Sequence, residues 1–271
     1  MVEELFRELS ALPEVDAIAL GGSRAGDTYD DKSDYDVYLY CNKDIKEEIR
    51  FLILSKYCKE MEIGNHFWEY EDNCRLNNNI DIDILYRDLD SFSKEIASVV
   101  EQHQARNGYT TCMWHNLNTC KVICDKKGLL LAAKQRFDVA YPQALKKNII
   151  EKNMKLLHTA MPAYEEQIAK AIKRNDVISI NHRTAAFMES YFDIIFAINE
   201  KTHPGEKRLI QLCKKECSIL PNYFEENINK LFDDLFTNTS AVTVDLKRII
   251  AELENVMCKA EESSMAVAAI N

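Results

Sequence analysis

Several features that define common classes of protein are missing from this sequence. No run of apolar residues is long enough to cross a bilayer, and the acidic, amphipathic start at residues 1–6 does not have the composition of a signal peptide. These absences predict a cytoplasmic protein with no membrane partner. The nine cysteines include no Cys-x-x-Cys pair, so we expect reduced thiols rather than disulfides or a zinc site.

Two common nucleotide-binding motifs are also missing. Neither G-x4-G-K-[ST] nor G-x-G-x-x-G occurs, which excludes the P-loop and Rossmann modes of binding. Basic residues are scarce in residues 1–125, where 13 Lys plus Arg stand against 25 Asp plus Glu, whereas residues 126–271 hold 21 and 19. An acidic half repels nucleic acid and favours metals and cationic acceptors, although an acidic surface can also serve solubility alone.

The hydrophobic pattern divides the chain into two parts. Residues 1–125 alternate between helical and strand periods, which predicts a mixed β-sheet flanked by helices; from residue 126 onward only helical periods follow. The expected fold class is therefore α+β, with a catalytic domain at 1–125 and an α-helical bundle at 126–271. Helices are predicted at 2–12, 44–61 and 88–102, and strands at 15–20, 35–40, 66–70, 80–86 and 119–124.

Carboxylates occupy alternate positions of two predicted strands. Asp34 and Asp36 stand two residues apart, so on a strand they share a face, and Asp81 and Asp83 repeat this spacing between isoleucines. Anions this close repel one another, and a divalent cation removes the repulsion. The pattern predicts a metal site formed by Asp34, Asp36 and the strand that carries Asp81 and Asp83, and the resemblance described below selects Asp83 as the third ligand. Asp81 either shares that site or is an accessory, solvated carboxylate.

A glycine turn directly follows the first predicted strand. Gly22 allows the backbone to approach a ligand closely, and the successive amides of Gly22 and Ser23, with the Ser23 hydroxyl, suit the β and γ phosphates of a nucleotide. Arg24 and Lys32 are the nearest cations that could offset phosphate charge. For these two residues, ordinary surface charge is the competing interpretation.

The order of these elements resembles the polymerase-beta-like nucleotidyltransferases, in which a Gly-Ser turn precedes Asp-x-Asp on a strand and a third Asp on another strand. The chain is most similar to their small-molecule branch, the aminoglycoside and lincosamide nucleotidyltransferases. The matching segments are residues 22–26, 33–36, 83–89 and 204–209.

The resemblance implies transfer of a nucleoside monophosphate, AMP from ATP, to a hydroxyl of a small and cationic acceptor. Two magnesium ions, or manganese, would be the cofactors. Asp34 and Asp36 would bridge the two ions, and Asp83 would hold the catalytic ion and accept the proton of the acceptor hydroxyl. Acceptor identity and oligomeric state stay open.

One helix of the second half carries a further candidate. Glu189 and Asp193 lie one turn apart on the apolar segment 184–199, and like charges at that spacing call for a cationic partner. The structural interpretation is an ion pair with Lys207 or Arg208. The functional interpretation, which the resemblance implies, is that Glu189 is a general base facing a cationic acceptor.

Two other functions fit the same residues. A nucleotidyltransferase that modifies a protein or RNA, of the toxin–antitoxin type, is one; such chains are typically short, and the acidic balance disfavours RNA. The other is a nucleotide-binding module without catalysis, although the three carboxylates are all present.

Overall fold

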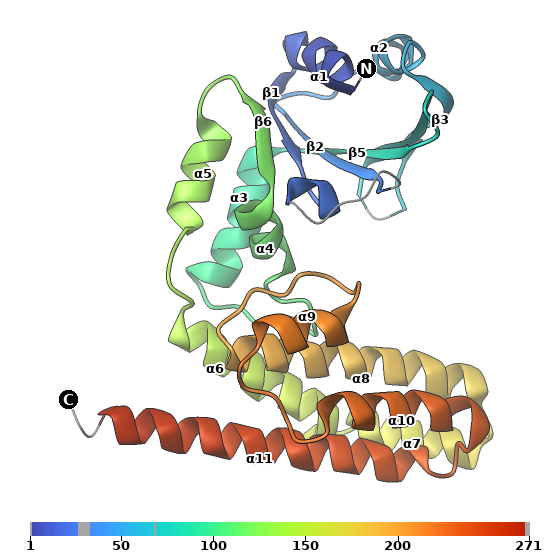
Figure 1. Cartoon of the computed structure of the whole chain (residues 1–271), viewed down its shortest axis with the longest axis vertical. Coiled ribbons are helices and arrows are strands. Elements are labelled where there is room, and N and C mark those ends of the chain that lie inside the picture. Colours follow the sequence, from blue (N-terminus) through green and yellow to red (C-terminus); the bar gives the residue numbers. More distant parts are fainter. Residues whose placement is uncertain (1, 27–32, 68, 269–271) are drawn as a thin grey trace. The chain divides into compact units, whose positions relative to one another are not determined.

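A computed structural model describes residues 2–26, 33–67 and 69–268, with side chains to residue 259 (Figure 1). Contacts divide the chain into a sheet unit, Met1–Glu101 and Met113–Val139, and a helical unit, Gln102–Cys112 and Ala140–Asn271. This division differs from the predicted boundary at 125/126, because residues 126–139 group with the sheet and 102–112 with the helices. Among the described residues, no helix has both the length and the apolarity to span a membrane.

The sheet is mixed, as predicted. Its six strands follow the order β3-β4-β5-β2-β1-β6, with β2 and β5 parallel and the other neighbours antiparallel. The strands are β1 (Val15–Leu20), β2 (Tyr35–Cys41), β3 (Cys58–Asn65), β4 (Glu71–Leu76), β5 (Asp81–Arg87) and β6 (Lys121–Asp125).

Helices cover both faces of this sheet (Figure 1). On one face, α1 (Val2–Ala11) buries Leu5 and Leu9, which recur at helical spacing, and α2 (Glu47–Leu54) packs into the same core. On the other face, the ring of Phe92 lies 5.7 Å from that of Tyr40. The helices of that face are α3 (Leu89–Val100), α4 (Cys112–Thr119) and α5 (Leu129–Phe137).

Two predictions in the sheet unit were wrong. The helix expected over 44–61 ends at Leu54, and β3 begins at Cys58. β3 is an edge strand whose Lys59 and Glu60 are exposed, so it lacks the apolar alternation of an inner strand. The strand expected at 66–70 lies instead at 71–76, where Asp72 is buried against Arg50, a partner that local sequence does not reveal.

The helical unit is built around α8 (Val177–Ile198), which contains most of the predicted segment 184–199. Most of α8 from Phe187 onward is buried, as expected of a helix that is apolar on nearly all sides. Its neighbours are α6 (Gln143–Met154), η2 (Lys155–Thr159), α7 (Tyr164–Lys173), α9 (Leu209–Glu216), α10 (Phe224–Thr237) and α11 (Val242–Ala268).

Candidate active site

The turn after β1 is shaped by glycine. The Gly21 N–H donates to the carbonyl oxygen of Asp36 (2.8 Å), which ties the turn to β2. Gly22 has φ +57° and ψ −151°, a conformation that residues with a side chain rarely adopt. A Cβ at Gly22 would lie 1.8 Å from Asp36 Oδ2. The turn therefore presents bare backbone to the Asp36 carboxylate.

Ser23 continues this turn as the first residue of a short 3-10 helix, η1 (Ser23–Ala25). The Ala25 N–H donates to the carbonyl oxygen of Gly22 (3.3 Å). The structure thus brings the predicted phosphate-binding turn and one predicted metal ligand together, while their roles stay predictions.

Asp36 and Asp83 are register partners on the parallel strands β2 and β5. Partners on neighbouring strands point to the same face of a sheet, and the strands lie about 4.8 Å apart. We call the face that carries these two side chains the carboxylate face. Asp34 precedes β2 by one residue and, like Asp36, is half-buried. The two carboxylates lie side by side because of a pairing between segments that are distant in sequence.

The donor set suits magnesium in the presence of a phosphate ligand. Within the described ranges, no group of three His, Cys, Asp or Glu side chains is arranged to hold a metal by itself. Magnesium, however, is commonly held by one or two carboxylates together with phosphate oxygens and water. Asp36 and Asp83 provide such a pair, and the missing side chain at Gly22 lets the Asp36 carboxylate lie directly against the turn.

Asp81 is occupied elsewhere. Its Oδ1 accepts a hydrogen bond from Arg75 Nε (2.8 Å) across the strand pair, and Arg75 also contacts Glu60 (3.0 Å). The Asp81 side chain is 56% exposed. This arrangement is a surface ion-pair cluster, which favours the accessory interpretation of Asp81.

A buried carboxylate on the carboxylate face was missed by the sequence analysis. Glu71 is 5% exposed and pairs with Leu85, two residues from Asp83 on the same face. Burial raises the pKa of Glu71, and the nearby charge of Asp83 raises it further. The residues next to it in sequence, Tyr70 and Asp72, gave no signal that Glu71 is buried and not a solvated surface glutamate.

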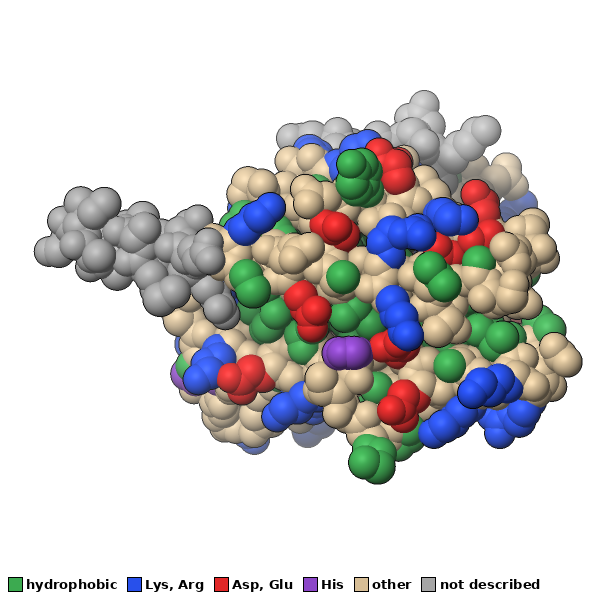
Figure 2. Space-filling view, turned by 90° about the horizontal axis from the view of Figure 1, so that it is seen from below, with side chains coloured by type: hydrophobic (Ala, Val, Ile, Leu, Met, Phe, Trp, Pro, Cys, Tyr) green, Lys and Arg blue, Asp and Glu red, His purple; other side chains and the backbone are tan. Residues whose placement is uncertain are grey.

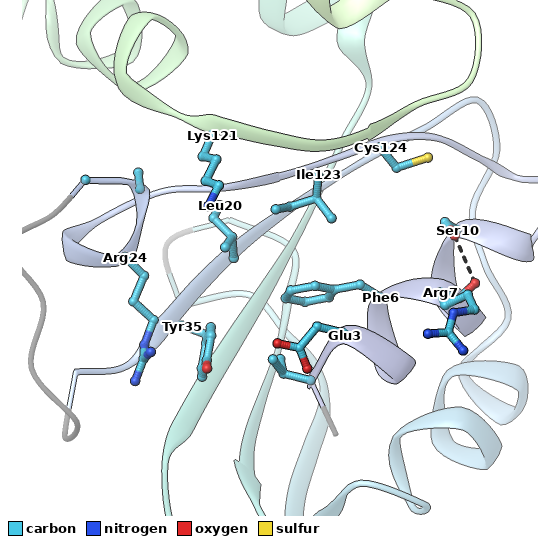
Figure 3. A pocket seen from close by; sticks show the side chains of 13 residues that line it. Glu3, Phe6, Arg7, Ser10, Leu20, Arg24, Tyr35, Lys121, Ile123 and Cys124 are labelled. Carbon is cyan, nitrogen blue, oxygen red and sulfur yellow. Dashed lines mark hydrogen bonds between the residues drawn. The ribbon is translucent and has the colours of Figure 1, made fainter.

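Arg24 lies away from this face. Its Nε donates to the carbonyl oxygens of Ser33 (2.8 Å) and Asp34 (3.1 Å), and its guanidinium lies 3.9 Å from the centre of the Tyr35 ring. Tyr35 alternates with Asp36 along β2 and so points to the opposite face. Figure 3 shows Arg24 beside Tyr35 at a cavity of about 780 Å³ that α1 and β6 also line. Lys32, the other predicted cation, lies outside the described residues.

The helical unit has a cavity of its own, of about 500 Å³. Its lining includes Tyr109, Met188, Glu189, Phe192, Glu206 and Arg208. Glu189 is half-buried, and no hydrogen bond or ion pair joins it to another residue in the described part of the chain. Burial raises its pKa, an effect that His182 partly offsets. Burial, together with Glu189 and Glu206, raises the pKa of Tyr109 to about 12.

The segment beside Glu189 is held tightly against α8. Gly108 has φ +81°, and a Cβ there would lie 2.8 Å from the Cβ of Glu189. Asp193 accepts hydrogen bonds from Thr110 N (3.0 Å), Thr110 Oγ1 (2.7 Å) and Asn153 Nδ2 (3.1 Å). This segment therefore forms a fixed wall of the cavity.

The expectation of a cationic partner was wrong for Asp193. Its partners are the hydroxyl, amide and backbone groups above rather than Lys207 or Arg208. Burial raises the pKa of Asp193 to about 6, while these hydrogen bonds lower it. Neutral donors take the place of the expected ion pair because Thr110 and Asn153 enclose the Asp193 carboxylate. Both residues are far from Asp193 in sequence, so the sequence did not reveal them.

Residues 110–209 match a family model described as a domain of unknown function, DUF4037. The matched span contains Glu189, whereas the turn at Gly22 and the carboxylates of β2 and β5 lie outside it. No curated protein is significantly similar in sequence.

Two solved structures are similar at low levels of identity. A nucleotidyltransferase-like protein from Exiguobacterium sibiricum is 11% identical with a TM-score of 0.41, covering 96% of this chain and 75% of its own. An aminoglycoside 6-adenyltransferase from Bacillus subtilis is 8% identical with a TM-score of 0.30, covering 100% of this chain and 97% of its own.

Gly22→Ala should remove the response to nucleotide. Magnesium and a triphosphate at about a hundredfold excess over the dissociation constant should stabilise the wild type by about 2.7 kcal/mol in thermal unfolding. The added methyl group would displace the Asp36 carboxylate, so the variant should lose this shift. Gly26→Ala is the control, because no described residue lies within 4 Å of its Cβ position. Equal shifts in all three proteins would contradict the phosphate and metal assignment of this turn.

Glu189→Gln should stabilise the protein at neutral pH. A carboxyl whose folded pKa is raised binds its proton more tightly in the folded state, so stability falls as pH rises through that pKa. The variant should therefore melt about 2 °C higher than wild type at pH 7.5, with a smaller difference at pH 4. The exposed Glu254→Gln serves as control. A lower melting temperature at pH 7.5 would identify Glu189 as a member of an ion pair.

Proposed function

We propose that the protein is a metal-dependent nucleotidyltransferase that transfers AMP from ATP to a hydroxyl of a small molecule and releases pyrophosphate. One observation carries the proposal. Asp36 and Asp83 lie side by side on parallel strands, and the backbone of Gly22 closes against Asp36 without a side chain between them. A phosphate-binding turn beside paired carboxylates is what magnesium and a triphosphate require.

Each residue of this site has a defined task in the proposed reaction. Gly22 and Ser23 bind the β and γ phosphates through their amides and the serine hydroxyl. Asp34, Asp36 and Asp83 would hold magnesium, which would neutralise charge at the attacking and leaving oxygens. The acceptor oxygen forms a bond to the α-phosphorus, and the bond to pyrophosphate breaks. Asp83 orients the acceptor hydroxyl and receives its proton.

The cavity of the helical unit supports a cationic acceptor. The Glu189 carboxylate, half-buried and with only the charge of His182 acting on it, lies in a lining that also holds Glu206, Arg208 and the aromatic rings of Tyr109 and Phe192. Carboxylates and aromatic faces attract an amine and its apolar scaffold. In this role Glu189 binds the acceptor and is the second candidate for the general base.

Charge distribution disfavours nucleic acid as the acceptor. On the face of the helical unit drawn in Figure 2, lysines and arginines are interspersed with acidic and apolar side chains. A polyanion binds to gathered positive charge. We therefore favour a small molecule over an RNA acceptor.

The test is transfer of label from α-labelled triphosphates, in the presence of magnesium or manganese, to a library of hydroxylated amines. The wild type should label at least one compound and release pyrophosphate. Asp36→Asn or Asp34→Asn should abolish transfer, because each removes an oxygen that holds the metal. Both variants should stay folded, and their melting temperature without metal should not fall, since mutual repulsion is reduced.

Asp81→Asn is the matched control, since Asp81 stands on β5 two residues before Asp83 but pairs with Arg75. It should keep most of the activity. Wild-type rates from purified Asp36→Asn would contradict the metal assignment. Loss of activity in Asp81→Asn alone would indicate that Asp81, and not Asp83, is the metal ligand on β5.

A further inference from the structure

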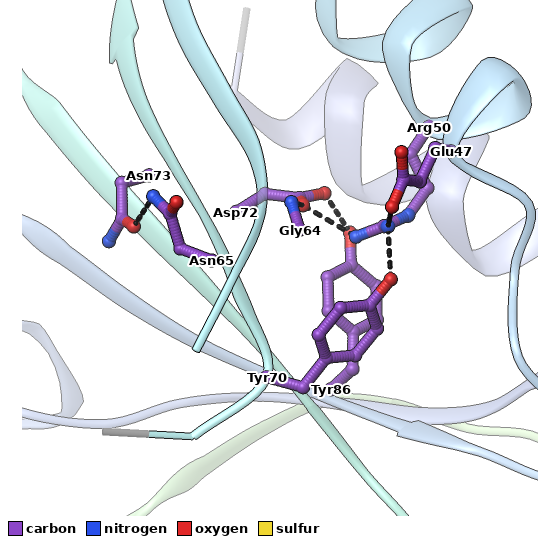
Figure 4. Close-up of polar contacts among 8 residues, drawn as sticks. All are labelled: Glu47, Arg50, Gly64, Asn65, Tyr70, Asp72, Asn73 and Tyr86. Atoms are coloured by element: carbon purple, nitrogen blue, oxygen red, sulfur yellow. Dashed lines mark hydrogen bonds and ion pairs between the residues drawn. The ribbon is translucent and has the colours of Figure 1, made fainter. Parts of the chain in front are cut away.

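Strand β4 presents consecutive polar residues to opposite faces of the sheet. Asp72 pairs with Ile84, which belongs to the core packed on α1 and α2, whereas Asn73 pairs with Asp83 on the carboxylate face. Figure 4 shows the two side chains diverging, Asp72 toward Arg50 and Asn73 toward Asn65. Because the two residues are adjacent on β4, contacts that hold Asp72 on one face also fix the strand position from which Asn73 points to the other face.

Asp72 is held by three different elements. Its Oδ1 accepts from Arg50 Nη1 of α2 (2.5 Å) and from the Gly64 N–H of β3 (2.8 Å), and its Oδ2 accepts from the Tyr86 hydroxyl of β5 (2.7 Å). The Asp72 and Arg50 side chains are both fully buried. The Arg50 guanidinium also lies over the rings of Tyr86 (4.7 Å) and Tyr70 (4.9 Å). This cluster fixes β4 between its two neighbouring strands.

On the other face, Asn73 makes two directed hydrogen bonds, and it also interacts with the Glu71 carboxylate. Its Nδ2 donates to Asp83 Oδ1 (2.8 Å), and its Oδ1 accepts from Asn65 Nδ2 (2.7 Å). An amide has one accepting and one donating end, so the bond from Asn65 turns the donating end of Asn73 toward Asp83. Asn65 in turn contacts Glu62 (3.2 Å). Asp83 Oδ1 therefore accepts a hydrogen bond within the chain, whereas no described residue donates to Asp83 Oδ2.

We propose that Asn73 is a positioning residue that orients the Asp83 carboxylate for the metal ion, and that Asn65 holds Asn73 in the required orientation. This inference rests on the proposed function of Asp83. Groups that hydrogen-bond to a metal-binding carboxylate fix its direction, and their loss weakens metal binding although they do not touch the metal. The competing account is that Asn73 is only a cross-strand pair that helps to set the register of β4 and β5.

The positioning account predicts that loss of Asn73 weakens metal binding. The register account predicts a loss of stability without a loss of metal affinity. Manganese binding is measured from the electron paramagnetic resonance signal of free Mn²⁺, with a non-hydrolysable ATP analogue present, so no acceptor is needed. Asn73→Ala should weaken Mn²⁺ binding by roughly tenfold, and Asn65→Ala by a smaller factor. In the double variant, Asn65→Ala should add no further loss, because its effect passes through Asn73.

Arg75→Gln is the matched control, because Arg75 stands two residues from Asn73 on the same strand and face but contacts Asp81 and Glu60. It should bind Mn²⁺ as the wild type does. Wild-type affinity in Asn73→Ala, or equal additive losses from Asn65 and Asn73, would overturn the positioning role. Asn65→Ala keeps the test decisive if Asn73→Ala does not fold. Absence of Mn²⁺ binding in the wild type would instead overturn the proposed function.

Discussion

The parallel pairing of β2 with β5 is the constraint on which the candidate site depends. It places Asp36 opposite Asp83 although 47 residue positions separate them, and no local structure could do so. A parallel pair needs a long crossover, and here the connection consists of α2, β3 and β4. The segment that makes the crossover also supplies Asn73 and Glu71, so one topological requirement assembles both the carboxylates and their neighbours.

The alternation of side chains along each strand separates two kinds of chemistry. On the core face, Asp72 accepts hydrogen bonds from Arg50 and from the Tyr86 hydroxyl in a buried setting, where an unpaired charge would be costly, while Arg50 Nε is left without a described partner. On the carboxylate face, Asp36 lies beside Asp83, and among the described residues no cation contacts Asp83 or Glu71. The first arrangement pairs opposite charges within the folded chain, and the second is suited to an added ion.

Sequence patterns predicted those parts of the fold whose signal is local. Apolar residues at helical spacing up to Pro13 predicted α1, and the apolar run before Gly21 predicted β1 at its observed residues. β3 and β4 were misplaced because their polar residues are accommodated by partners far away in sequence, as Arg50 accommodates Asp72. Where a strand is stabilised by a distant ion pair, its own residues look like those of a solvated loop.

The same distinction applies to the site. Asp36 and Gly22 could be predicted because the motif is short and ordered, and the structure brings them into contact distance. Glu71, and Asn73 as a partner of Asp83, could not be predicted, since their relation to Asp83 depends on strand register. Glu189 was found from its charge on an apolar helix, whereas the partners of Asp193 come from the segment at Thr110.

The most direct test of the account is a crystal structure with Mn²⁺ and a non-hydrolysable ATP analogue, read by anomalous scattering. The account predicts an anomalous peak within about 2.2 Å of a carboxylate oxygen of Asp36, with the β and γ phosphates at the Gly22–Ser23 turn. Ordered nucleotide without a metal peak at Asp34, Asp36 or Asp83, or a metal bound at Asp81 instead, would contradict it.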